Sequence, residues 1–189
     1  MTHPPVYIAA AKSLHGAKTA KVGVRDALHG ALTAYTKTLM GLGWIQILEP
    51  ERKNGTQPNT VGGRKMTYWI RRNLGIVSED EPKEPGIVIL DVRDLRDEAN
   101  PPQNIIPKIA AGVWLVEHGM AVVVQCQGGI SRSPGIAAAI IAYMDKIPFE
   151  DALNEVQDKV RRAMPEMSLR DSIKSALRTM NEQHLERKG

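Results

Sequence analysis

The chain contains one cysteine, Cys126, which is followed six residues later by Arg132 and then by Ser133. The β-branched run over residues 121–125 predicts a buried strand that ends at the cysteine. Pro134 predicts the start of a helix, because proline is favoured in the first helical turn. When a short loop joins a strand to a helix N-terminus, its backbone N–H groups and the helix dipole attract an anion. These residues therefore predict an anion cradle with a thiol at its base.

The predicted cradle loop consists of Gln127, Gly128, Gly129, Ile130 and Ser131. Its two glycines allow a tight curl and a close approach by the anion. A thiol that faces several amides, a helix N-terminus and an arginine favours its thiolate form. The planar guanidinium of an arginine matches two oxygens of a phosphate. The chemistry that these groups support is attack of sulfur on phosphorus, with a phosphocysteine intermediate, and Ser133 would hydrogen-bond the departing sulfur.

Residues 126–133, Cys-Gln-Gly-Gly-Ile-Ser-Arg-Ser, resemble the Cys-x5-Arg-Ser/Thr loop of protein tyrosine phosphatases. The run Gly-Ile-Ser-Arg-Ser-Pro over 129–134 is most similar to the dual-specificity branch of that superfamily. Weaker similarity extends over the segments 7–11, 42–48, 149–153 and 161–165. The resemblance implies one dual-specificity phosphatase-like domain over residues 1–189. It also implies a cysteine-dependent hydrolase that acts on phosphotyrosine, phosphoserine or phosphothreonine in proteins.

The resemblance also implies a role for each site residue. Cys126 would be the nucleophile, Arg132 and the loop amides would bind the phosphoryl group, and Ser133 would assist turnover. Such phosphatases need a general acid on a loop some thirty residues before the cysteine, where Asp94 and Asp97 are the two candidates. Asp94 is preferred because it follows the strand expected over residues 87–90, and Asp97 is the alternate acid. The family usually has histidine directly before the cysteine, whereas this chain has Gln125.

The elements that must position these residues alternate along the chain, which predicts an α/β fold with a central, mostly parallel sheet flanked by helices. We expect the site at the carboxyl end of the strand over 121–125. The expected strands are 6–10, 44–48, 87–90 and 121–125. The expected helices are 25–42, 66–73, 103–117, 135–144, 151–164 and 169–180. A polar loop over 49–65 is too long for an ordinary structureless connection.

Composition narrows the classes of function. Apolar residues make up 42% of the chain and charged residues 24%, which are ordinary globular values. Because Cys126 is the single cysteine, no intramolecular disulfide can form, and a cytoplasmic location is expected. No apolar run is long enough for a membrane-spanning helix. Aromatic residues are scarce at 4%, which argues against a base-stacking surface. The five histidines show no ligand spacing, so the sequence implies neither a metal nor an organic cofactor.

Several alternatives remain open at the level of sequence. The expected partner is a phosphorylated protein or another phosphomonoester; the net charge of +4 leaves nucleic acid possible without indicating it. The same loop serves RNA 5′-phosphatases and phosphoinositide phosphatases, although the loop here lacks the lysines common in the latter. A non-catalytic phosphate-binding module and a sulfurtransferase are further alternatives. The interpretations of the remaining residues are structural: solvated helix faces for Arg71, Arg72, Arg161 and Arg162, and core positions for Met164, Met167 and Met180.

Overall fold

The computed structural model describes residues 40–41, 43–47, 67–81 and 86–186. The chain divides into two compact units, Met1–Ile45 and Gln46–Gly189, and every candidate site residue lies in the second. The strand expected over 6–10 and the loop over 49–65 lie outside the described residues. So does the helix expected over 25–42, except for Met40 and Gly41, which are helical. The expectation of a single domain over residues 1–189 therefore stays a prediction.

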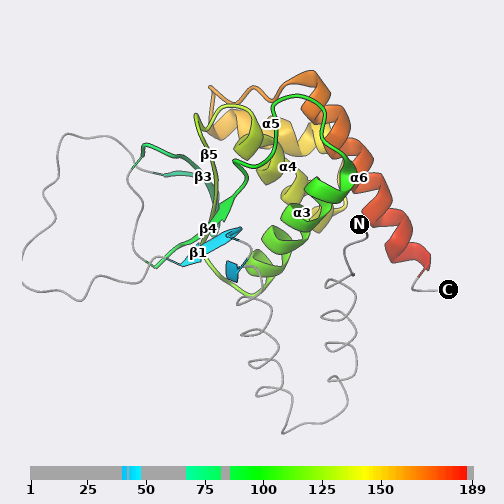
Figure 1. Ribbon diagram of the computed structural model, residues 1–189, viewed down its shortest axis with the longest axis horizontal. Helices are drawn as coiled ribbons and strands as arrows, with labels where there is room; N and C mark the ends of the chain where they lie inside the picture. Colours follow the sequence, from blue (N-terminus) through cyan, green and yellow to red (C-terminus); the bar gives the residue numbers. More distant parts are fainter. Residues whose placement is uncertain (1–39, 42, 48–66, 82–85, 187–189) are drawn as a thin grey trace, which may run out of the picture. The chain divides into compact units, whose positions relative to one another are not determined.

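One mixed sheet and four helices make up the described architecture (Figure 1). The strands are β1 (Ile45–Ile47), β2 (Tyr68–Arg71), β3 (Leu74–Ser78), β4 (Val88–Asp91) and β5 (Val122–Cys126). The helices are α3 (Pro102–Glu117), α4 (Arg132–Asp145), α5 (Phe149–Lys159) and α6 (Met167–Glu186). The sheet order is β1-β4-β5-β3-β2. Both neighbours of β5 run parallel to it, and β2 pairs antiparallel with β3. The predicted mostly parallel α/β fold is confirmed.

The central strand β5 is buried along its whole length, as its run of three valines predicts. Its parallel register pairs Ser78 of β3 with Cys126 and Asp91 of β4 with Gln125. The last residues of three neighbouring strands therefore meet at one edge of the sheet. This is the edge at which open parallel sheets place their ligands.

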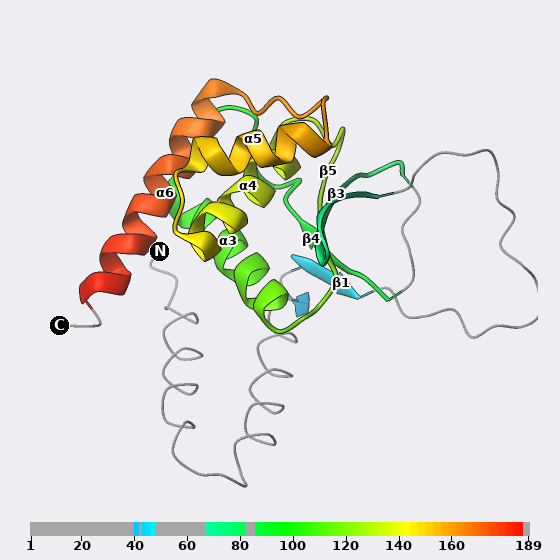
Figure 2. The same ribbon diagram turned by 180° about the vertical axis from the view of Figure 1, so that it is seen from behind.

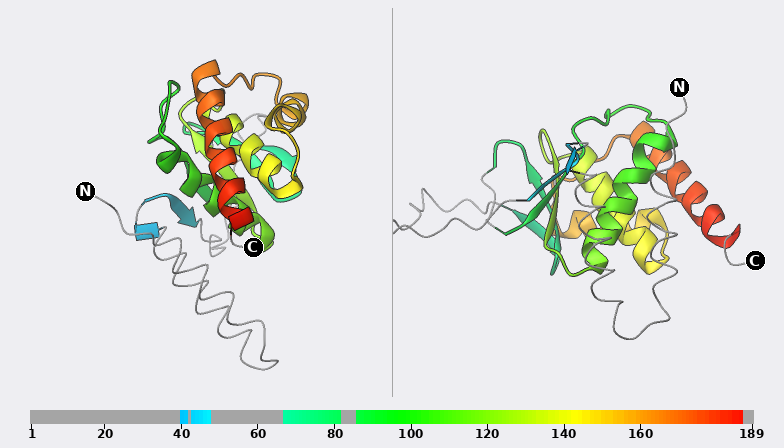
Figure 3. Two further views of the ribbon diagram at one scale, coloured as in Figure 1. Left: turned by 90° about the vertical axis from the view of Figure 1, so that its right-hand side faces the viewer. Right: turned by 60° about the horizontal axis from the view of Figure 1, so that its bottom comes forward.

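The helices α3 to α6 gather on one side of the sheet (Figures 1 and 3). Helix α4 is the central helix, and α3, α5 and α6 all pack against it (Figure 2). Its residues from Ser133 to Ala142 are buried, which explains why this segment is small and apolar on every face. Gly112 permits the close packing of α3 on α4, because a Cβ there would lie 2.2 Å from Cδ1 of Ile140. Among the described helices, none is long and apolar enough to cross a membrane.

The helix predicted over residues 66–73 is wrong, because the segment forms the β2–β3 hairpin. Thr67, Tyr68, Trp69 and Ile70 are β-branched or aromatic residues that favour a strand. Gly75 lies within β3 opposite Trp69. A Cβ at this glycine would lie 3.0 Å from the indole ring, so the residue makes room for the cross-strand aromatic side chain.

The helix predicted over residues 151–164 begins at Phe149 and ends at Lys159. Beyond its end the chain turns, and the Met164 N–H donates to the Ile130 carbonyl over 2.7 Å. Met164 and Met167 are therefore exposed, and the prediction that they fill the core is wrong. Met180 is buried, so its core position is confirmed.

Candidate active site

The sulfur of Cys126 lies at the base of the loop between β5 and α4, and the residue is 2% exposed. The Gly129 N–H donates a hydrogen bond to Sγ over 3.2 Å. The Ser133 Oγ, which belongs to the first turn of α4, lies 3.1 Å from the same sulfur. An amide and a hydroxyl aimed at one sulfur stabilise a negative charge on it.

The curl of the loop depends on Gly129, whose φ of 65° lies in the left-handed region. A Cβ at this position would lie 3.0 Å from Nη2 of Arg162 and 3.4 Å from the backbone nitrogen of Ser78. Gly128 has no such restriction, because the nearest atoms to its Cβ position belong to Ile130 at 3.7 Å. Of the two glycines, Gly129 is therefore the one whose backbone conformation and close contacts require a residue without a side chain.

Arg162 lies in the turn after α5 and reaches the loop from the side of the β2–β3 hairpin. Its Nη2 pairs with Oε1 of Glu81 at 3.0 Å, and its guanidinium lies 4.7 Å from the centre of the Tyr68 ring. The other carboxylate oxygen of Glu81 accepts the Ser78 N–H at 2.9 Å. Arg162 is exposed, as predicted, but it lies in a turn beyond the end of α5, so its predicted place on a helix face is wrong. The charge of Glu81 offsets the positive charge of this arginine.

The N-terminus of α4 opens toward the same loop. Its N-cap residue, Ser131, makes no side-chain hydrogen bond to the amides of the first turn. Because these N–H groups have no intrahelical partner either, they are available to an anion. The loop, the sulfur and the helix end thus lie together where the sequence predicts an anion cradle, and anion binding there stays a prediction.

Arg132, the first residue of α4, binds the segment over residues 92–97, which follows β4 and is called the acid loop below. Its Nη1 donates to the carbonyl oxygens of Arg93 at 3.1 Å and Leu95 at 3.2 Å. Its Nε lies 3.4 Å from Oδ2 of Asp97. The guanidinium therefore joins the acid loop to the cradle.

The two candidate acids have different partners. Asp97 faces Arg132, and its buried Oδ1 has no hydrogen-bond partner among the described residues. Asp94 is half-exposed, and its Oδ1 lies 3.0 Å from Nζ of Lys108. The carboxylate of Asp97 therefore faces the guanidinium of Arg132, and the carboxylate of Asp94 is held by a lysine of α3.

Lys108 is the site residue that the sequence analysis missed. It is 1% exposed, and its Nζ also donates to the Asp91 carbonyl at the end of β4, over 2.8 Å. Burial lowers the pKa of its ammonium, although the nearby carboxylates of Asp94 and Asp91 oppose this effect. The available signal was a lysine between Ile105 and Ile109 on an otherwise apolar stretch of helix.

Other contacts hold the two ends of the acid loop. At its start, the hydrogen bonds of Arg93 overcome the effect of burial and hold the pKa of the Asp91 carboxyl below its ordinary value. Arg93 also pairs with Glu79, which follows β3. Beyond its end, the Asn100 side chain accepts the Arg96 N–H and donates to the Arg96 carbonyl. The loop is therefore anchored on both flanks as well as at its centre.

Gln125 occupies the position directly before the cysteine, within β5. Its backbone carbonyl accepts the Val92 N–H over 2.9 Å, which joins the strand to the start of the acid loop. Its side chain is buried, and Oε1 has no hydrogen-bond partner in the part of the chain that the structure describes. An uncharged amide therefore stands behind the cradle, where the family that the loop resembles has a histidine.

Exposed apolar side chains line the outer rim of the cradle. Ile130, Met164 and Met167 are 47%, 71% and 63% exposed. A backbone hydrogen bond joins the first two, and the Glu166 N–H lies 3.4 Å from the Ser131 hydroxyl. The segment over residues 163–167 therefore lies against the second half of the loop and presents an apolar rim beside the anion cradle.

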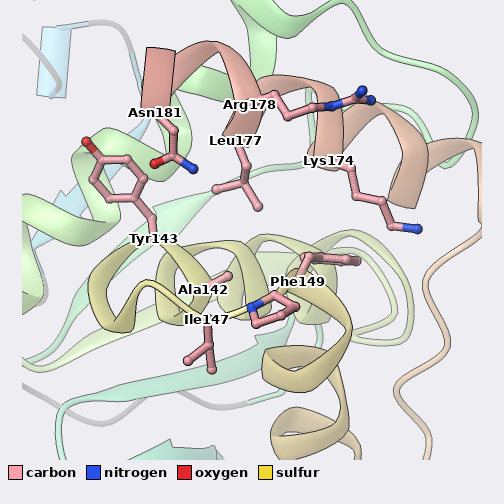
Figure 4. A pocket seen from close by; sticks show the side chains of 9 residues that line it. Ala142, Tyr143, Ile147, Phe149, Lys174, Leu177, Arg178 and Asn181 are labelled. Atoms are coloured by element: carbon pink, nitrogen blue, oxygen red, sulfur yellow. The ribbon is translucent and has the colours of Figure 1, made fainter. Parts of the chain in front are cut away.

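A separate hollow of about 320 Å³ lies at the other end of α4, between its C-terminus, the start of α5 and α6 (Figure 4). Its lining includes Tyr143 and Leu177, with Lys174, Arg178 and Asn181 as polar groups. The fourteen residues of α4 separate it from the cradle by about 20 Å, so it is not part of the site. Within the described ranges, no three His, Cys, Asp or Glu side chains gather closely enough to hold a metal ion.

Three solved phosphatase structures share this fold. A mouse protein described as a dual specificity phosphatase, solved with zinc tungstate, has a TM-score of 0.57 and 16% identity over 70% of this chain and 97% of its own. Human DUSP28 has a TM-score of 0.52 and 16% identity, and the match covers 63% of this chain and 97% of that one. A leucine rich repeat and phosphatase domain containing protein from Entamoeba histolytica has a TM-score of 0.50 and 15% identity. The match covers 62% of this chain and 94% of that one.

No protein-family model and no curated protein matches the sequence. The structural neighbours nonetheless confirm the fold that the loop over residues 126–133 predicts, which is that of dual-specificity phosphatases.

Proposed function

We propose that the chain is a cysteine-dependent phosphatase that hydrolyses phosphate monoesters through a phosphocysteine intermediate. The observation that carries the proposal is the pair of hydrogen bonds to the Cys126 sulfur, from the Gly129 amide and with the Ser133 hydroxyl, at the open N-terminus of α4. This arrangement places a sulfur nucleophile at the base of the loop and offers amide donors to the oxygens of a phosphoryl group.

In the proposed reaction the Cys126 thiolate attacks phosphorus, and the bond between phosphorus and the leaving oxygen breaks. Arg132 and the amides of residues 127–132 bind the equatorial oxygens. Asp94 donates a proton to the leaving oxygen, with Asp97 as the alternate acid. The same carboxylate then takes a proton from the water that cleaves the sulfur–phosphorus bond, and Ser133 donates a hydrogen bond to the departing sulfur.

We further propose that the substrate is a phosphorylated protein, with phosphotyrosine as the best group. The support is the apolar rim of Ile130, Met164 and Met167, which suits an aromatic ring or an apolar neighbouring side chain. Phosphoserine and phosphothreonine proteins are the other members of the proposed substrate class. RNA 5′-ends and phosphoinositides carry several anionic groups, and Arg162 beside the loop is already paired with Glu81. The cytoplasmic location stays a prediction.

The test compares the wild type with Cys126→Ser on p-nitrophenyl phosphate, without added metal and with vanadate as inhibitor. We expect turnover by the wild type alone, and vanadate should abolish it. Equal turnover by the variant would remove the mechanism, and an inactive wild type that still binds phosphate would indicate a binding module. Release of thiocyanate from thiosulfate and cyanide would instead indicate a sulfurtransferase.

A substrate panel then tests the substrate class. It contains a phosphotyrosine peptide, a phosphoserine peptide, a 5′-triphosphorylated RNA and an inositol phospholipid. We expect the highest kcat/KM on the phosphotyrosine peptide. A higher value on the RNA or the lipid would contradict the protein substrate while leaving the cysteine mechanism intact.

A further inference from the structure

Lys108 is a charged residue at a core position of α3, where an apolar side chain would be expected. It is the charged residue of an otherwise apolar stretch of α3, and the residue is 1% exposed. Burying an ammonium group is costly unless it is paired and hydrogen-bonded. Two partners of its Nζ among the described residues belong to the same short stretch of chain: the Asp91 carbonyl at 2.8 Å and Oδ1 of Asp94 at 3.0 Å.

We infer that Lys108 is a positioning residue that holds Asp94 as the general acid of the reaction. The inference rests on the proposed function. The lysine binds one carboxyl oxygen, Oδ1, and leaves Oδ2 to carry the proton to the leaving group. It also fixes the end of β4, from which the acid loop departs. Because Lys108 belongs to α3, both fixed points are set by a packed helix.

The two carboxylates of the acid loop then have separate tasks. Asp97 faces Nε of Arg132, so it orients the guanidinium that binds the phosphoryl group. Asp94 faces a lysine of α3, so its carboxyl is positioned by a side chain other than Arg132. A loss of Lys108 should therefore impair proton donation, and a loss of Asp97 should impair phosphate binding.

Proton donation and phosphate binding can be separated by comparing kcat on substrates whose leaving groups differ in basicity. p-Nitrophenolate leaves readily without protonation, whereas the phenolate of phosphotyrosine needs the general acid. The change to test is Lys108→Met, which keeps the length of the side chain and removes its charge. We expect kcat on a phosphotyrosine peptide to fall about tenfold to a hundredfold, because misplacing a catalytic group costs rates of that order. We expect a much smaller fall on p-nitrophenyl phosphate and an unchanged KM.

A double-mutant cycle with Asp94→Asn completes the test. If the lysine acts through Asp94, adding Lys108→Met to Asp94→Asn causes no further loss on the phosphotyrosine peptide. The matched control is Lys174→Met, which removes a lysine ion-paired with Glu150 on the far side of α4 and should leave both activities unchanged. Thermal melts of all variants establish that they fold.

Two results would overturn the inference while the proposed function stands. One is an equal loss on both substrates in folded Lys108→Met. The other is a further loss of the same factor in the Asp94→Asn background. If Lys108→Met does not fold, the Asp94→Asn variant alone tests the inference. Its kcat must then fall much further on the phosphotyrosine peptide than on p-nitrophenyl phosphate, and an equal fall would overturn the inference. A wild type without turnover, or a Cys126→Ser variant with full turnover, overturns the proposed function and this inference with it.

Discussion

The Cys126 sulfur has two neighbours that respond differently as the reaction proceeds. The Gly129 amide comes from the loop, and the Ser133 hydroxyl comes from the buried first turn of α4. A hydroxyl can rotate to donate when the sulfur gains charge, so its contribution is largest when the thiolate forms. In the proposed second step the sulfur leaves as that thiolate.

Replacing Ser133 by alanine should therefore slow the hydrolysis of the intermediate more than its formation. A hydrogen bond to a charged group contributes about 1.5–3 kcal/mol, which corresponds to about a tenfold to hundredfold fall in kcat. Stopped-flow release of p-nitrophenol should show a burst followed by a slow steady state. The control is Ser175→Ala in α6, and a Ser133→Ala variant with the kcat of the wild type would contradict this role.

The glycines of the loop provide a matched pair. Gly129→Ala should destabilise the fold by about 1–3 kcal/mol, because alanine is strained at a φ of 65°. It should also lower phosphatase activity, since the new Cβ would displace Arg162 or the loop. Gly128→Ala should cost far less of both. Urea melts and activity assays of the two variants measure the difference, and equal effects would show that the positive φ does not matter.

Among the strands and helices, ion pairs of Arg71 join the edge strand β2 to α4 and α5. Arg71 at the end of β2 donates from Nε and Nη2 to the two carboxylate oxygens of Glu155 in α5, each at 2.7 Å. Its Nη2 also lies 2.7 Å from Oδ2 of Asp145 at the end of α4. The prediction that Arg71 lies on a solvated helix face is wrong, because it joins one strand to two helices.

The ion pairs of Arg71 with Glu155 and Asp145 predict a contribution to the free energy of unfolding that depends on pH. The hydrogen bonds from Arg71 hold the pKa values of Glu155 and Asp145 below their ordinary values, so this contribution is present above about pH 4.5. It is lost as the pH falls through the lowered values. Arg71→Met should cost about 1 kcal/mol at neutral pH, since all three side chains are about a third exposed.

Urea unfolding of the wild type and Arg71→Met from neutral pH down to about pH 3 measures this effect. The difference in free energy of unfolding should narrow in the acid range. Arg72→Met, which changes the exposed neighbour in the hairpin turn, is the control. A difference that stays constant with pH would contradict the assignment of these pKa shifts.

The strands and helices that the sequence predicts best are those with one dominant signal. The valines of β5 and the small apolar residues of α4 admit few alternatives, and both elements form where expected. The helix predicted over 66–73 is wrong because a four-residue strand and the two-residue turn after it have nearly the length of two helical turns, so the length of the segment does not separate the two structures. The exposure of Met164 could not be predicted, because it follows from the contact of its backbone with Ile130 across the loop.

Within the candidate site, the sequence indicates the contacts that a short loop imposes. Cys126 ends β5 and Ser133 lies in the first turn of α4, so the loop between these elements brings the Ser133 hydroxyl to the sulfur. Lys108 and Arg162 reach the site through pairings distant in sequence, and no spacing indicates those. The partners of Asp94 and Asp97 likewise belong to two different helices.

At the scale of the molecule, the fold brings the ends of β3, β4 and β5, the acid loop and the N-terminus of α4 to one edge of the sheet. A net charge of +4 suits an anionic substrate without indicating a nucleic-acid surface. The apolar rim and the paired Arg162 both lie beside the loop. Substrate choice should therefore depend on what is attached to the phosphate, and the phosphate itself should be bound by Arg132 and the loop amides.

The most direct measurement is chemical trapping of the phosphoenzyme. The Ser133→Ala variant is mixed with p-nitrophenyl phosphate, quenched during the burst and digested, and the peptides are analysed by mass spectrometry. We expect one phosphoryl group on the peptide that contains Cys126, attached to sulfur and absent from Cys126→Ser. Turnover with no phosphorylated cysteine at any quench time, or with the phosphoryl group on another residue, would contradict it.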